Sequence, residues 1–83
     1  MTAEEQAAEI IDQVLNRRKI ARRDLMGRYR GAPLVAARRE VIRALRERVV
    51  INGKPASLPW IGRLLNRHYT TVLHYLQTPE PRR

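Results

Sequence analysis

Residues 57–74 read SLPWIGRLLNRHYTTVLH, and this stretch predicts two short helices joined by a tight turn. Ser57 is a favoured residue for capping a helix N-terminus, and Pro59 suits the first turn of the helix that follows. The turn is expected at Asn66–Arg67, and a last helix is expected over about residues 68–76. Such a pair of helices is typical of a helix-turn-helix motif.

The predicted last helix separates its polar and apolar side chains. The polar ones follow the i, i+3, i+4, i+7 spacing of one helical face: Arg67, Thr70, Thr71 and His74. The apolar ones fall on the opposite side: Val72, Leu73 and Leu76. In a helix-turn-helix the second helix enters the DNA major groove with its N-terminal residues at the base edges. The pattern therefore favours a DNA-reading helix over an ordinary amphipathic surface helix.

The segments before this motif complete an all-α chain. Thr2 and Glu5 form a capping-box pattern, so a first helix is expected over residues 3–18. Further on, we expect a short helical turn over 20–26, a loop over 27–33, the longest helix over 34–50 and a turn over 52–57, with no strand pattern. In the long helix, the arginines are expected on the faces away from the apolar stripe: Arg38, Arg39, Arg43 and Arg46. In the next helix, Gly62 indicates that another segment packs close to it.

The charge of the chain is strongly positive and unevenly distributed. Seventeen basic residues stand against 8 acidic ones, for a formal net charge of +9, and 15 of the basic residues are arginines. Residues 1–15 hold four of the acidic residues and no basic one, whereas every basic residue lies from Arg17 onward. Because arginine forks onto phosphate and guanine, this balance favours a nucleic-acid partner over a merely solubilising surface.

Other functional classes find little support in the composition. The chain has no cysteine and only two histidines, so we expect neither a disulfide framework nor a metal site. No nucleophile with a base and an orienting group is evident, and no G-x-x-x-x-G-K-[ST] loop, so we expect no enzyme, no catalytic residue and no cofactor. No apolar run could span a membrane and no secretory signal is present, which predicts a cytoplasmic protein.

Two motifs carry a resemblance to a known family. SLP-x-IG at 57–62, followed by RHYTTVLH at 67–74, resembles the SLPEIG and RDHTTVLHA motifs of the C-terminal DNA-binding domain of the bacterial replication initiator DnaA. Upstream, EIIDQVLNRRKIARRDLMGRYR (9–30) resembles the family's first helix, turn and basic loop, and AARREVIRAL (36–45) resembles its long helix. The resemblance thus covers residues 5–78.

The resemblance implies both a fold and a function. The implied fold is an all-α, Trp-repressor-like helix-turn-helix bundle of about five helices, with one domain over residues 1–78 and a flexible tail over 79–83. The implied function is sequence-specific binding of double-stranded DNA at an A·T-rich DnaA box. We expect a stand-alone small protein, a monomer rather than a dimer, that regulates replication initiation or transcription in the nucleoid without ATPase activity.

The family's functional positions also imply roles for particular side chains. The run that reads the major groove corresponds here to Arg67, His68, Tyr69, Thr70 and Thr71. An arginine of the basic loop enters the minor groove in the family, and Arg30, with Arg28 beside it, matches that position. In the family the Ser-Leu-Pro segment and the long helix touch the phosphate backbone, which implies such contacts for Arg39, Arg46, Leu58 and Pro59. Apart from the resemblance, phosphate contacts are also expected from Lys54 and His74.

This chain departs from the family's motif in its turn, which is one residue shorter, and at three side chains. His68 stands at the family's Asp, Tyr69 at its His and Trp60 at its Glu. The helical wheel places Tyr69 nearer the apolar side, whereas the family match points it at bases. We favour bases because side chains of a first turn lean toward the helix N-terminus. A related box with a changed C·G preference is expected.

A second interpretation is a protein-interaction adaptor of the replication or transcription machinery, with weak or non-specific DNA binding. The acidic, amphipathic first helix or Trp60 would then hold the protein partner. A DNA reader predicts strong salt sensitivity and sequence discrimination, whereas an adaptor predicts a stable protein complex that is indifferent to DNA sequence.

Overall fold

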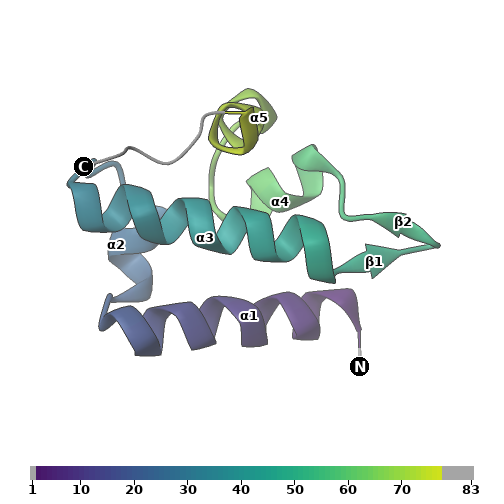
Figure 1. Ribbon diagram of the computed structural model, residues 1–83, viewed down its shortest axis with the longest axis horizontal. Helices are drawn as coiled ribbons and strands as arrows, with labels where there is room; N and C mark the ends of the chain where they lie inside the picture. Colours follow the sequence, from purple (N-terminus) through teal and green to yellow (C-terminus); the bar gives the residue numbers. More distant parts are fainter. Residues whose placement is uncertain (1, 78–83) are drawn as a thin grey trace.

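The computed structural model describes residues 2–77, which form five α-helices and one antiparallel hairpin (Figure 1). The elements are α1 Ala3–Arg18, α2 Arg22–Met26, α3 Ala32–Arg48, β1 Val50–Ile51, β2 Lys54–Pro55, α4 Leu58–Leu64 and α5 Tyr69–Gln77. The expected all-α class with about five helices is therefore confirmed. The end of the expected domain at residue 78 and the expected tail over 79–83 lie outside the described residues.

Local signals fix both ends of α1. The Thr2 hydroxyl accepts from the Glu5 backbone N–H (3.1 Å) and the Glu5 carboxylate accepts from the Thr2 N–H (2.9 Å), so the expected capping box is present. The helix ends where Lys19 adopts left-handed backbone (φ 57°) and the Ile20 N–H donates to the Leu15 carbonyl, as in a Schellman motif. The expected apolar face is buried: Ala7, Ile10, Ile11, Val14 and Leu15.

The helices pack in layers around α3. In Figure 1, α1 and α3 run antiparallel, and α5 crosses α3 on the side away from α1. α2 closes one end of this pair, and α4 packs beside α5. The buried side chains that fill the space between them beyond α1 are Leu25, Ala37, Val41, Ile42, Leu45, Val49, Ala56, Ile61, Leu65 and Val72. This core holds the helix-turn-helix pair against the rest of the chain.

The turn between α4 and α5 is a Schellman motif centred on Asn66. Asn66 has left-handed backbone (φ 55°), which asparagine tolerates better than most residues. The Arg67 N–H donates to the Gly62 carbonyl (2.8 Å), and the Asn66 N–H donates to the Arg63 carbonyl (3.4 Å). A Cβ on Gly62 would lie 2.5 Å from the Arg67 carbonyl oxygen, so the expected close approach at this glycine is confirmed.

The bounds of α3 differ from those expected from sequence. The helix begins at Ala32 instead of residue 34, so Pro33 belongs to its first turn and the basic loop is shortened to residues 27–31. Proline is tolerated there because its missing N–H would have no helical partner. The helix ends at Arg48 instead of residue 50, because the chain turns to extended backbone at Val49 and enters the hairpin.

The last helix also differs slightly from its expected form. It spans Tyr69–Gln77 rather than residues 68–76. Val72 is fully buried as expected, but Leu73, assigned to the same apolar side, remains 36% exposed. The reason lies in the tertiary structure: α5 packs mainly against α3 and α4, and Leu73 is not among the side chains that this packing buries.

The hairpin was not expected from sequence. Val50 pairs with Pro55 and Ile51 with Lys54, and Asn52–Gly53 form the two-residue tip. Both tip residues have positive φ, 53° and 79°, which is the backbone of a type I′ turn. Asn-Gly after an apolar Val-Val-Ile run is the local signal for such a hairpin.

Candidate nucleic-acid interface

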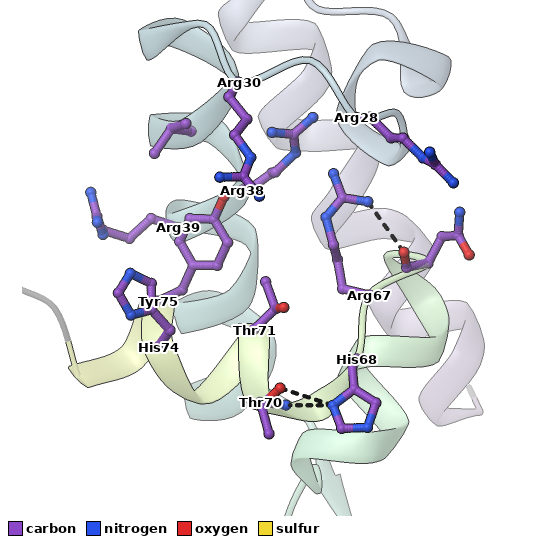
Figure 2. Close-up of a pocket in the computed structure, with 12 residues that line it drawn as sticks. Arg28, Arg30, Arg38, Arg39, Arg67, His68, Thr70, Thr71, His74 and Tyr75 are labelled. Carbon is purple, nitrogen blue, oxygen red and sulfur yellow. Dashed lines mark hydrogen bonds between the residues drawn. The ribbon is translucent and has the colours of Figure 1, made fainter.

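A hollow of about 820 Å³ lies between the basic loop and α5 (Figure 2). The loop supplies its upper rim in the figure, α5 its lower rim, and α3 lies behind. The lining residues are mostly cationic or hydrogen-bonding: Arg28, Arg30, Val35, Arg38, Arg39, Asn66, Arg67, His68, Thr70, Thr71, His74 and Tyr75. The hollow thus brings together the two segments for which the sequence predicted separate DNA contacts.

Arg38 fixes the start of the basic loop from within the core. Its sequence-based placement on an outer face of α3 is wrong, because the side chain is 1% exposed. Nε donates to the Leu25 carbonyl (2.8 Å), and Nη2 donates to the carbonyls of Asp24 (2.9 Å) and Gly27 (3.0 Å). Carbonyls at the end of a helix have no partner within it, so a buried cation beside them is well satisfied.

Arg67 completes this arrangement from the other side of the hollow. It donates from Nη1 to the Met26 carbonyl (3.0 Å) and from Nη2 to the Gly27 carbonyl. Burial, helped by the positive charges of Arg38 and Arg30, lowers the pKa of Arg67. The guanidinium predicted to reach DNA therefore also ties the turn before α5 to the basic loop.

Arg39 is the second arginine that the sequence wrongly placed on an outer face. It is 5% exposed, and its Nε has no hydrogen-bond partner among the described residues. Its guanidinium carbon lies 5.8 Å from the centre of the Tyr75 ring, within range of a cation–π contact. In Figure 2 the Tyr75 ring lies in the hollow, between the side chains of Arg39 and Arg30. Arg39 lines the hollow but is almost wholly buried, so little of its side chain is exposed for the predicted phosphate contact.

The basic loop presents its side chains to solvent. Arg28 and Arg30 are exposed, and within residues 2–77 neither has a hydrogen bond or an ion pair. Tyr29 between them is 73% exposed, with its ring over Gly31, where an added Cβ would lie 2.5 Å from a ring carbon. Both arginines are therefore available to a ligand that reaches the hollow.

The start of α5 is organised by His68. Its Nδ1 accepts from the Thr70 backbone N–H (3.3 Å) and lies 2.9 Å from the Thr70 hydroxyl. With Nδ1 as the acceptor, the proton lies on Nε2, which remains a donor. Thr70 and His68 are exposed, Thr71 is half-buried at the hollow, and Tyr69 is 46% exposed. These predicted readers thus share the first turn of one helix.

Among the residues that the structure describes, no acidic side chain neutralises the charge around the hollow. No Asp or Glu is among the residues that line it. The ion pairs of the described residues use Arg17 and Arg18 with Glu40, and Arg22 with Asp12, all away from the hollow. An anionic ligand would therefore meet arginines that have no carboxylate partner.

The other predicted phosphate contacts are spread along the rest of this surface. Arg46 donates from Nη1 to the Ala56 carbonyl (2.6 Å), so it also anchors the base of the hairpin. Lys54 is exposed on the hairpin, Leu58 and Pro59 form the first turn of α4, and His74 lies at the hollow's rim. The hollow therefore includes His74 and Arg39 but not Arg46, Lys54, Leu58 or Pro59.

Sequence reasoning missed two residues of the hollow for which a signal exists. Arg38 lies four residues after Leu34 and four before Ile42, so it falls on the apolar face of α3. Tyr75 follows Thr71 by four residues and shares its face of α5. By contrast, no local pattern indicates that Asn66 would line the hollow.

No family model, curated protein or solved structure matches this chain. Among residues 2–77 no helix has the length and apolarity needed to cross a lipid bilayer. Over the same residues, no three His, Asp or Glu side chains cluster in a way that could hold a metal ion. The features that indicate a function are therefore the motif of residues 57–74 and the geometry of the hollow.

Proposed function

We propose that this protein binds double-stranded DNA sequence-specifically at an A·T-rich site related to the DnaA box. The observation that carries the proposal is the cationic hollow between the basic loop and the first turn of α5, which no carboxylate of residues 2–77 lines. A helix-turn-helix presents the start of its second helix to base edges, and the start of α5 carries hydroxyl and imidazole groups. The motif resemblance of residues 57–74 supports the same reading.

In this mechanism the two rims of the hollow contact adjacent grooves. Thr70 and Thr71 reach base edges in the major groove, where a threonine offers a hydroxyl and a methyl group. Arg28 and Arg30 extend into the neighbouring minor groove, whose narrow A·T-rich form attracts arginine. The strand between the grooves then passes the hollow, where Arg39 meets its phosphates.

The biological role that fits such binding is regulation. A small box-binding protein without an ATPase of its own competes with an initiator, or with RNA polymerase, for the same DNA. It acts as a monomer at the nucleoid, on replication initiation or on transcription. His68 and Tyr69 set which box is preferred, since they stand where the family has Asp and His, and Arg67 holds the turn that carries them.

Fluorescence anisotropy at about physiological salt tests the proposal. A labelled duplex carrying the DnaA box is compared with the same duplex whose box is scrambled. A preference of about 100-fold or more is expected, within the range of specific over non-specific binding. Equal, weak binding to both duplexes contradicts box reading. A selection from random DNA then shows whether another sequence is preferred, and failure to enrich any sequence rejects the proposal.

The adaptor function stays the second candidate because of the position of α1. This helix lies on the side of α3 away from α5, and its exposed face carries Glu4, Glu5 and Glu9. A basic protein surface could bind there without touching the hollow. Retention of a protein partner by the wild type but not by a Glu4→Gln, Glu9→Gln variant, with no box preference, would favour it.

A further inference from the structure

The β1–β2 hairpin is a well-anchored projection. Its tip is Asn52–Gly53, and open space surrounds Gly53. Its base is closed by the Ala56 N–H, which donates to the Val49 carbonyl (3.0 Å), and by Arg46, which holds the Ala56 carbonyl. The base of the hairpin is therefore attached to the end of α3.

A second hollow, of about 490 Å³, lies between this hairpin and α4. Ile51, Pro55 and the half-buried Trp60 form its apolar part. Two exposed cations, Lys54 and Arg63, also line it, and no Asp or Glu is among its lining residues. An apolar floor with cations beside it fits a deoxyribose–phosphate strand, which offers both an apolar sugar and an anionic phosphate.

The position of the hairpin suits a duplex that already fills the first hollow. The hairpin and the basic loop lie at opposite ends of the molecule's longest dimension, and α5 stands between them (Figure 1). That dimension is 37 Å. One turn of B-DNA measures about 34–36 Å, so a duplex that lies along this dimension meets the two ends about one turn apart.

We propose that the hairpin and the exposed side of α4 form a second DNA contact, which binds the phosphate backbone of the duplex just beyond the box. Lys54 and Arg63 bind phosphate oxygens, and Trp60 packs against the sugar. The contact is independent of sequence and lengthens the footprint. This inference rests on the proposed function, since the box fixes where the duplex lies. DNA is favoured over a protein partner because neither cation has an ion pair within residues 2–77, and because this hollow, like the first, is lined by cations with no acidic side chain of those residues among them.

Three duplexes test the contact: one that ends at the edges of the box, and two that extend it by about ten base pairs on one side or the other. Wild-type protein is expected to bind one of the two extended duplexes about three- to tenfold more tightly than the box-length duplex, because only that extension reaches the hairpin. A gain of this size is what two exposed charge contacts contribute. The Lys54→Gln, Arg63→Gln double variant is expected to bind all three duplexes equally. Its salt slope on the favoured duplex should be shallower by about 2.

A matched control is Lys19→Gln, which removes an exposed positive charge at the end of α1, away from the hairpin. It should keep the full gain from the extension. The emission of Trp60, the only tryptophan of the chain, reports directly on the second hollow. It is expected to change with the favoured extended duplex and to stay constant with the box-length duplex.

The outcomes separate this inference from the proposed function. If the wild type prefers the box but neither extension raises its affinity, the hairpin contact is wrong and box reading stands. The same holds if the double variant binds the extended duplex with the same gain in affinity as the wild type. If the wild type shows no box preference, the proposed function fails. In that case, equal affinity of the wild type and the double variant for a long scrambled duplex also contradicts the hairpin contact.

Discussion

The Nη1 of Arg67 donates to the Met26 carbonyl at 3.0 Å, across 41 residues of sequence. This bond joins the turn before α5 to the end of α2, and Gly27 receives a further bond from the same guanidinium. The basic loop begins at that point and carries Arg28 and Arg30. Arg67 therefore sets the distance between the segment proposed for the minor groove and the helix proposed for the major groove.

Substituting Arg67 should affect both stability and DNA binding. Arg67→Met keeps the aliphatic stem but removes the bonds to the two carbonyls, so the free energy of unfolding should fall by about 1–3 kcal/mol. Urea denaturation measures this loss, and anisotropy should show weaker box binding. Arg30→Met is the control, because Arg30 is exposed: stability should change by less than about 0.5 kcal/mol while box binding falls. Equal stability of the two variants would show that Arg67 does not hold the loop.

Gly62→Ala should destabilise the helix-turn-helix, although alanine favours helices by about 1 kcal/mol. Its Cβ would meet the Arg67 carbonyl oxygen, which is backbone and can shift only if the turn moves. A net loss of about 1–3 kcal/mol in thermal or urea unfolding is expected, together with weaker box binding.

Gly53→Ala provides the comparison for this prediction. It also strains the chain, since its φ is 79°, but it lies at the hairpin tip. It should lower stability by about 1 kcal/mol and leave binding to a box-length duplex unchanged. A stabilised Gly62→Ala variant would contradict the close approach of the turn.

Thr71→Val tests base reading with little change of shape. The hydroxyl is lost and the volume is kept, so discrimination between box and scrambled duplex should fall by about 1–3 kcal/mol while the fold is retained. Thr71 is chosen over Thr70 because the Thr70 hydroxyl also contacts the His68 ring. Arg46→Ala, at a predicted phosphate contact, should instead weaken both duplexes alike. If Thr71→Val weakens both duplexes equally, Thr71 contacts phosphate and not a base.

The stability of α1 should depend on pH through Glu5. Hydrogen bonds from the Thr2 backbone and side chain lower the pKa of the Glu5 carboxyl in the folded chain. As the pH falls, the Glu5 carboxyl of the unfolded chain therefore takes up its proton before that of the folded chain. The stabilisation is complete above the pKa of Glu5 in the unfolded chain, and it is lost as the pH falls through the lower pKa of Glu5 in the folded chain. Glu5→Gln should therefore be less stable than wild type near neutral pH, and the difference should shrink below about pH 4.

The control for this prediction is Glu4→Gln, which removes a charge from the same helical turn. It leaves the hydrogen bonds between Thr2 and Glu5 in place, so its stability should keep the pH dependence of the wild type. Circular dichroism during urea unfolding at several pH values gives both comparisons. A constant difference between Glu5→Gln and wild type would rule out this role of Glu5.

Much of the fold could be predicted because its signals are local. The capping box at Thr2, the N-cap at Ser57 and the spacing of apolar residues each act within one helix. The hairpin has a local signal as well, the Asn52–Gly53 pair, but proline and serine nearby favoured an irregular turn. The N-terminal boundary of α3 differs from the expected one because Pro33 is compatible with either a loop or a first helical turn.

The sequence by itself determined the five helices, the tight turn at Asn66 and the excess of arginine. Only the tertiary structure decided what each arginine does. Arg38 and Arg67 turn to the carbonyls of residues 24–27, Arg46 to Ala56, and Arg39 to Tyr75, whereas Arg28 and Arg30 remain exposed. The reason is physical: helix ends, turns and apolar faces are set by neighbours in sequence. The partner of a long cationic side chain is set by whichever carbonyls or aromatic rings folding brings within its reach.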